Sequence, residues 1–153
     1  MKKLLSIIFI LPFLLGCKEK EYTGFKLTLE KDESGELTLA DPNTLYDVAI
    51  TNEKDCAFYI GDDACSNCQK LKPQLEAWVK AYKYRIYYIP VSSITEENVQ
   101  KLYDATVAAV GYYQWAEDSS VPTTYFFSAK TVVFRGGADN TVNFLLKYVN
   151  VNE

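Results

Sequence analysis

The sequence predicts an α/β domain with a mixed central sheet flanked by helices. Three observations support this: short apolar runs typical of buried strands, longer segments with apolar residues at helical spacing, and alternation of the two along the chain. From Cys56 onward the predicted order is βαβαββα, preceded by an N-terminal β/α extension. The 153 residues, of which 48 % are hydrophobic, suffice for one domain with its own core.

The N-terminal extension is predicted from two apolar segments and one helix signal. Residues 25–29 alternate between apolar and polar side chains, and residues 35–39 follow a polar turn, which predicts a hairpin or a strand with an irregular return. Asp41 before Pro42 predicts a helix start, with the aspartate as N-cap. This helix is expected to end near Asn52.

The first half of the core contains two predicted strands and one long helix. Residues 56–60 and 84–91 are short apolar runs, which indicate buried strands. Between them, apolar residues recur at helical spacing, and Pro73 inside this pattern is expected to kink the helix. The apolar positions are Leu71, Leu75, Trp78, Val79 and Tyr82.

The second half of the core contains two helices around a hairpin. Residues 93–96 have capping-box spacing and precede an amphipathic helix over 99–110. The strands 123–128 and 131–135 are separated by two residues, which predicts an antiparallel hairpin. Asp139 is predicted to cap a last helix. Its apolar face is predicted to comprise Val142, Leu145, Leu146 and Val149.

The N-terminus has the pattern of an export signal. A basic start is followed by an apolar stretch over 4–15, which is too short to span a bilayer. Leu14-Leu15-Gly16-Cys17 resembles the bacterial lipobox; the alternative is an ordinary secretory signal with a chance cysteine. The lipobox interpretation divides the chain into a signal peptide (1–16), lipidated Cys17 with a tether (17–23) and a domain (24–153), anchored on the extracytoplasmic face of the cell membrane.

Charge and composition exclude several function classes. The formal net charge of −4 offers no basic footprint for nucleic acid. The chain has no histidine, so it lacks both the commonest general base at neutral pH and the commonest metal ligand.

Cys65 and Cys68 are the candidate catalytic residues. They are separated by two residues and lie at a predicted strand-to-helix junction. The N–H groups and dipole at a helix N-terminus favour a thiolate, so Cys65 is predicted to attack a partner's disulfide and Cys68 to displace the product. The pair needs no cofactor beyond its own redox-active disulfide.

Other interpretations of the cysteines stay open at this point. The pair could form a static disulfide, although a four-residue loop stabilises little. It could also be half of a zinc site, for which Cys56 is the only further thiol of the mature chain, or a copper-delivery site. We interpret Cys56 as a structural residue, a small buried hydrophobe; the alternative is a third redox cysteine or an intermolecular link.

Residues 58–73 resemble the active-site segment of the thioredoxin superfamily. Pro73, five residues after the second cysteine, matches the proline at which that family kinks its first helix. Val121-Pro122 before a strand resembles the family's second landmark, a cis proline that faces the cysteine pair. The resemblance extends to a glycine after the last strand, Gly136 or Gly137, and implies a three-layer thioredoxin-like fold.

The resemblance also implies a function. Val121, Pro122 and Ala64 would bind the substrate chain, and the protein would exchange thiols and disulfides with exported proteins and with a membrane or extracytoplasmic redox partner. The whole chain resembles membrane-tethered thioredoxin-like proteins, including bacteriocin transport accessory proteins. The alternative function is a redox-inactive adaptor of a secretion or bacteriocin transport system.

Three positions depart from the family pattern. Ala64 stands where thioredoxins carry an aromatic residue, and Tyr59 where they carry a buried acid. The residues between the cysteines are Ser66-Asn67 in place of Gly-Pro. These departures argue against the activity of a general thioredoxin. The two cysteines and both prolines are present, and they favour thiol exchange itself.

Overall fold

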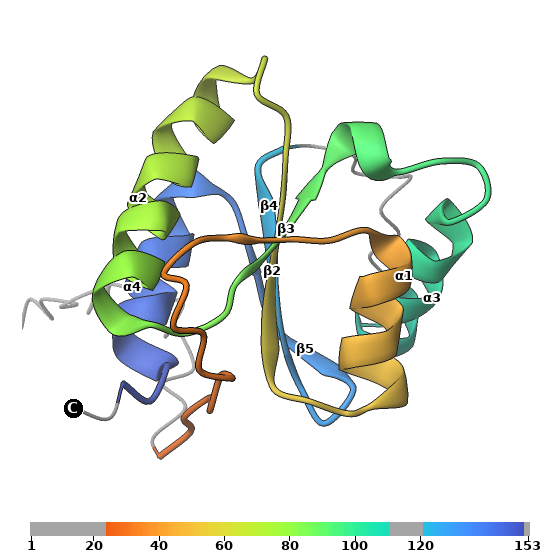
Figure 1. The fold of residues 1–153 in the computed structure, drawn as a ribbon. Coiled ribbons are helices and arrows are strands. Elements are labelled where there is room, and N and C mark those ends of the chain that lie inside the picture. Colours follow the sequence, from red (N-terminus) through yellow and green to blue (C-terminus); the bar gives the residue numbers. More distant parts are fainter. Residues whose placement is uncertain (1–23, 111–120, 152–153) are drawn as a thin grey trace, which may run out of the picture.

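A five-stranded mixed sheet lies between two layers of helices (Figure 1). The computed structural model describes residues 24–110 and 121–151. Its strands are β1 (Thr38–Leu39), β2 (Cys56–Gly61), β3 (Tyr87–Pro90), β4 (Thr123–Ser128) and β5 (Thr131–Gly136). Its α-helices are α1 (Pro42–Leu45), α2 (Ser66–Tyr82), α3 (Val99–Val110) and α4 (Ala138–Tyr148).

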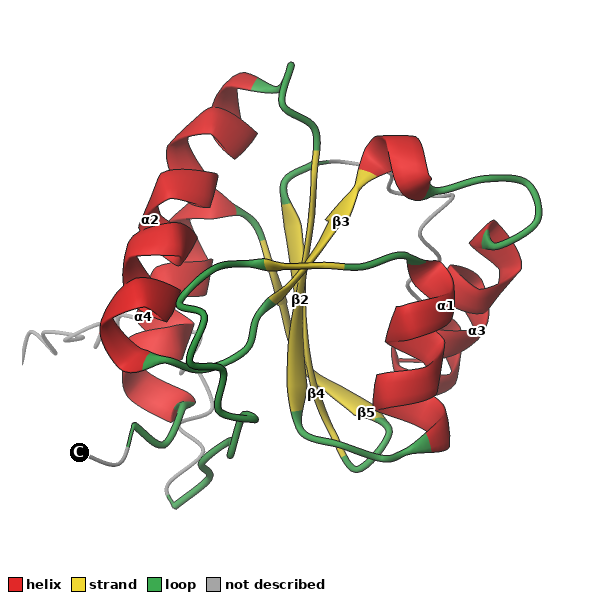
Figure 2. Cartoon of the chain, in the orientation of Figure 1, coloured by secondary structure: helices red, strands yellow, loops and turns green. Residues whose placement is uncertain are grey.

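The sheet order confirms the predicted βαβαββα core. The strands are arranged β1-β3-β2-β4-β5, with β3 parallel to both β1 and β2, and with β4 antiparallel to both β2 and β5. Figure 2 shows α2 and α4 on one face of the sheet and α1 and α3 on the other. The central strand β2 is therefore covered on both faces, and all of its residues are buried.

Side chains of β2 alternate between two cores. Ala57 and Tyr59 pack with apolar residues of α2 and α4, whereas Phe58 and Ile60 pack with residues of α1 and α3. This alternation follows from the two-residue period of a strand. It places Tyr59 on the same side of the sheet as α2, the helix that carries the cysteine pair.

The predicted N-terminal hairpin is wrong. Residues 25–29 have the expected alternating burial, but they form no regular strand and do not pair with residues 35–39. Leu27 pairs instead with Val149, through a 2.7 Å bond from Leu27 N–H to the Tyr148 carbonyl and a 2.8 Å bond from Asn150 N–H to the Leu27 carbonyl. The second segment supplies β1, which pairs with β3. Distant parts of the chain thus satisfy the backbone groups that a hairpin would have paired.

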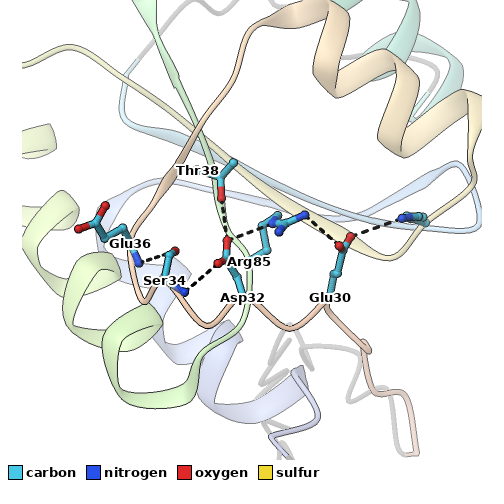
Figure 3. Close-up of polar contacts among 7 residues, drawn as sticks. Glu30, Asp32, Ser34, Glu36, Thr38 and Arg85 are labelled. Carbon is cyan, nitrogen blue, oxygen red and sulfur yellow. Dashed lines mark hydrogen bonds and ion pairs between the residues drawn. The ribbon is translucent and has the colours of Figure 1, made fainter.

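Arg85 fixes the N-terminal segment to the chain before β3 (Figure 3). Its guanidinium makes ion pairs with Glu30 at 2.9 Å and with Asp32 at 3.1 Å. Asp32 also accepts hydrogen bonds from Ser34 N–H at 3.0 Å and the Thr38 hydroxyl at 3.1 Å. The bonds from Ser34, followed by those from Arg85 and Thr38, hold the pKa of Asp32 well below its usual range.

An Asp32→Asn substitution is expected to destabilise the protein by about 1–3 kcal/mol at pH 7, because it weakens a network of charge-assisted bonds. Because the pKa of Asp32 is lowered on folding, its contribution is complete above the unfolded value of about 4 and is lost as the pH falls through the folded value. Urea unfolding of both proteins between pH 7 and pH 2.5 measures this difference. The exposed Glu33→Gln serves as control, and a wild-type advantage that does not shrink in acid would contradict the prediction.

Two predicted helix starts have different outcomes. Asp41 caps α1 as predicted, and its carboxylate accepts a 2.8 Å bond from Thr44 N–H. The segment then widens to a π-helix over Tyr46–Thr51, where Asn52 N–H bonds to the Asp47 carbonyl. The second predicted start, the capping box at residues 93–96, is wrong, because α3 begins only at Val99.

In place of the capping box, Asn98 organises a turn before α3. Its side-chain oxygen accepts from Thr95 N–H at 2.8 Å, and its amide nitrogen donates to the Ser93 carbonyl at 2.8 Å. These bonds give the backbone N–H and carbonyl groups of the turn local partners, and the helix begins at Val99.

Two other elements differ from the prediction in their boundaries. The strand predicted over 84–91 is limited to β3, because Tyr84 and Arg85 bond to the N-terminal segment and Val91–Ser93 forms a 3₁₀ turn. Helix α4 begins after Gly137 as N-cap, so Asp139 lies in its first turn and is not the cap. Helix α2, by contrast, agrees with the prediction: it runs from Ser66 to Tyr82 with Pro73 inside it.

The predicted signal peptide, Cys17 and the tether lie outside the described residues. In the part of the chain that is described, no helix has both the length and the apolar character needed to cross a membrane.

Candidate active site

The site lies where β2 ends and α2 begins. Between them, the Asp62 carbonyl accepts a 3.0 Å bond from Cys65 N–H, and its carboxylate accepts a 2.9 Å bond from Ala64 N–H. This turn places Cys65 at the N-cap of α2, where the Cys65 backbone is extended, with φ −83° and ψ 123°. The first thiol therefore faces the unpaired N–H groups of the helix.

The Cys65 thiol is partly exposed and lies in a thiolate-stabilising position. Its Sγ accepts a 3.2 Å bond from Cys68 N–H. A hydrogen bond from the Cys68 side chain, together with the N–H groups of Cys68 and Asn67, lowers the pKa of Cys65, while desolvation and the charge of Asp62 oppose this. Because the thiolate is the nucleophile, the lowered pKa favours attack by Cys65.

The Cys68 thiol has the opposite properties. It is 2 % exposed, and burial raises its pKa. Its Sγ accepts a 3.5 Å bond from Asp62 N–H, and the nearby Tyr59 hydroxyl lowers its pKa against the larger effect of burial. One thiol of the pair is thus accessible and activated, and the other is enclosed and protonated.

The loop before β4 faces the pair, as the resemblance implied. The Val121–Pro122 peptide bond is cis, and the Val121 carbonyl lies 3.4 Å from Cys65 Sγ. Val121 is half-buried, Pro122 is buried, and Ala64 is exposed next to Cys65. The fold therefore brings together the predicted site residues from two segments that are 56 residues apart.

Comparison with known proteins gives matches only among solved structures. No family model matches the sequence, and no curated protein matches it. The structure resembles thioredoxin O1 from Arabidopsis thaliana in the oxidised state, with 18 % identity, a TM-score of 0.53 and coverage of 74 % of this chain and 97 % of that one.

Two further matches have the same character. A point mutant of thioredoxin from Halobacterium salinarum has 21 % identity, a TM-score of 0.50 and coverage of 78 % of this chain and 96 % of that one. Spinach chloroplast thioredoxin f in its long form has 18 % identity, a TM-score of 0.50 and coverage of 73 % and 83 %. This chain has a thioredoxin fold.

Within the thioredoxin fold, Cys56 lies apart from the pair. It begins β2, whereas the pair follows the end of that strand, five residues or roughly 16 Å further on. It is 4 % exposed, and burial raises the pKa of its thiol far above the usual range. Cys56 therefore lies in the core as interpreted, and it is placed too far away to join the pair as a zinc ligand.

Metal ligands do not gather elsewhere in the described part of the thioredoxin fold. Among residues 24–110 and 121–151, no group of three or more His, Cys, Asp or Glu side chains is arranged to hold a metal ion. Cys56, Cys65 and Cys68 are free thiols.

Sequence reasoning missed one cluster behind the pair. Lys72 makes a 3.0 Å ion pair with Asp63, and its ammonium lies 4.6 Å from the centre of the Tyr88 ring. These contacts link the turn before α2, through Lys72, to the Tyr88 ring on β3. One signal was available: Lys72 is four residues after Cys68, so both lie on one side of the helix.

Proposed function

We propose that this protein is a thiol–disulfide oxidoreductase in which Cys65 attacks and Cys68 resolves. The asymmetry of the pair is the observation that carries the proposal. Cys65 is accessible and has a lowered pKa, whereas Cys68 is buried and has a raised pKa. A structural disulfide would need no such difference between its two sulfurs.

The proposed reaction has two exchange steps. The Cys65 thiolate attacks one sulfur of a substrate disulfide, a Cys65–substrate disulfide forms, and the other substrate sulfur leaves as a thiolate that takes a proton from water. Cys68 then loses its proton and attacks Cys65 Sγ, which releases the second substrate thiolate. The substrate gains two electrons, and the pair becomes a disulfide; the reverse sequence oxidises a substrate dithiol.

The surface beside Cys65 supports binding of an extended substrate chain. The Val121 carbonyl, Pro122 and Ala64 border the attacking sulfur. When a mixed disulfide replaces the thiol, the Val121 carbonyl loses its S–H donor and can accept a backbone N–H of the substrate. This role of Val121 is part of the proposal.

The N-terminal pattern supports a location for this chemistry. We propose that acylation of Cys17 anchors the protein on the extracytoplasmic face, where disulfides persist, and that its substrates are exported proteins. A membrane or extracytoplasmic redox partner would then return Cys65 and Cys68 to the oxidation state in which they started. Loss of the protein from the membrane fraction on Cys17→Ser substitution tests the anchor.

A turnover assay tests the proposed activity. Disulfide reduction and dithiol oxidation would be measured for the wild-type chain in detergent and for its Cys65→Ser and Cys68→Ser forms. Cys56→Ser is the matched control, since it removes a thiol of the same domain outside the site. We expect turnover only with Cys65 and Cys68 both present. Equal background rates in all four proteins would refute the activity and favour the adaptor function.

A further inference from the structure

Tyr59 connects the sheet to the resolving cysteine. Its side chain is fully buried on the α2 side of β2, and its ring stacks on Tyr88 with centroids 5.2 Å apart and planes inclined by 18°. The end of the ring passes beneath Gly61, where an added Cβ would collide with the hydroxyl and the ring. The glycine therefore lets the phenol reach α2.

The Tyr59 hydroxyl lies close to the Cys68 side chain. It lies beneath Gly61, and the next residue, Asp62, donates its backbone N–H to Cys68 Sγ at 3.5 Å, so the phenol and the thiol adjoin the same turn. The phenol lowers the pKa of Cys68 against the larger opposing effect of burial. Burial in turn raises the pKa of Tyr59, so the phenol keeps its proton. A phenol in that state can donate to a thiolate, but it cannot act as the base that removes the thiol proton.

We propose that Tyr59 is a positioning residue that stabilises the Cys68 thiolate during resolution by donating a hydrogen bond, without accepting its proton. The inference rests on the proposed function, since resolution is the second exchange step. In that step the Cys68 proton passes to water, the Cys68–Cys65 disulfide forms, the Cys65–substrate bond breaks, and the leaving thiolate takes a proton from water.

The other groups around Cys68 have different roles. Cys65 is its partner on the same helix, and from the preceding turn Asp62 donates its backbone N–H. Tyr88 on β3 stacks on Tyr59, but its ring also lies near the ammonium of Lys72, which is paired with Asp63. Tyr88 thus offers a matched control: a stacked, buried phenol on the same side of the sheet, next to the Lys72–Asp63 ion pair.

Two-phase kinetics test the proposal in the full chain carrying Cys17→Ser. A chromogenic aromatic disulfide releases one coloured thiolate when Cys65 attacks and a second when Cys68 resolves. In Tyr59→Phe we expect the first phase to change less than about twofold and the second to slow roughly tenfold at pH 7, with its pH profile moved to higher pH. Tyr88→Phe should keep the second phase within about twofold of wild type. An unchanged second phase in Tyr59→Phe, or equal slowing of both phases without a moved profile, would overturn the proposal.

A second measurement separates this inference from the proposed function. In a Cys65→Ser background, the Cβ resonance of Cys68 is titrated by NMR with and without Tyr59→Phe. We expect Cys68 to ionise at higher pH when the hydroxyl is absent, and identical titrations would overturn the inference. Wild type with a single kinetic phase would refute the proposed exchange, while the titration still reports on the hydrogen bond.

Discussion

The Cys68→Ser protein is expected to accumulate covalent complexes with its substrates, whereas Cys65→Ser should form none. Cys65 remains able to attack, because it keeps its place at the start of α2 and its bond from the backbone N–H of residue 68. A serine at position 68 cannot displace the bound substrate, so the mixed disulfide persists. Turnover should fall by about three orders of magnitude in either variant, as expected when an essential nucleophile is removed.

Non-reducing electrophoresis and mass spectrometry measure these complexes. The protein is expressed in cells that export it, free thiols are blocked, and bands that disappear on reduction are identified. Cys56→Ser should resemble wild type, because its sulfur is enclosed at the far end of β2. Complexes that form with Cys65→Ser as readily as with Cys68→Ser would contradict the assignment of the attacking sulfur.

Leu145→Ala and Leu146→Ala are expected to differ strongly in stability. Leu145 is fully buried on α4, in the core shared with α2, whereas Leu146 is 59 % exposed. Removal of the buried side chain should cost about 2–5 kcal/mol, the usual range for a leucine-to-alanine change in a core. The same change at Leu146 should stay within about 0.5 kcal/mol.

Urea unfolding of both variants measures this difference directly. The two substitutions are chemically identical and adjacent, so helix propensity contributes nearly equally to both. Equal losses of stability would show that α4 is rotated about its axis relative to the structure. A wild-type m-value in both variants is needed for the comparison, since it shows that the unfolding transition is preserved.

Leu146 also shows why part of the core could not be predicted. It follows Leu145 in an apolar pair, and helical spacing alone places both on a broad apolar face. Which of the two is buried depends on where α2 and the sheet contact α4, which is information from tertiary packing. The strands and helices after Cys56 were predictable because their signals are local: short apolar runs, helical spacing and a two-residue hairpin turn.

The N-terminal region failed for the complementary reason. Residues 25–29 have a strand-like pattern, but Leu27 pairs with Val149 after α4, and the next residues, 30 and 31, pair with the chain at 84–85. A pattern of alternation states which face is buried and does not state which segment pairs with it. The nearest apolar segment in the sequence was therefore the wrong partner.

The residues of the candidate site could be predicted from the sequence, but the contacts between them could not. The cysteine spacing and the proline before β4 were visible in the sequence, and the structure brings Cys65, Cys68 and Val121 together. The contact of Tyr59 with Cys68 depends on the strand register and on Gly61, and so it required the structure. In the sequence, Tyr59 stands out only as a departure from the thioredoxin pattern.

Redox equilibrium of the wild-type chain tests most directly whether Cys65 and Cys68 form one reversible couple. The protein is equilibrated in buffers of graded dithiol-to-disulfide ratio, its free thiols are alkylated, and the Cys65–Cys68 disulfide is quantified by mass spectrometry. We predict a single two-electron transition, in which the oxidised-to-reduced ratio changes tenfold for about 30 mV, with Cys56 reduced throughout. A pair that stays fully reduced or fully oxidised over the whole range, or a disulfide that includes Cys56, would contradict the proposed exchange.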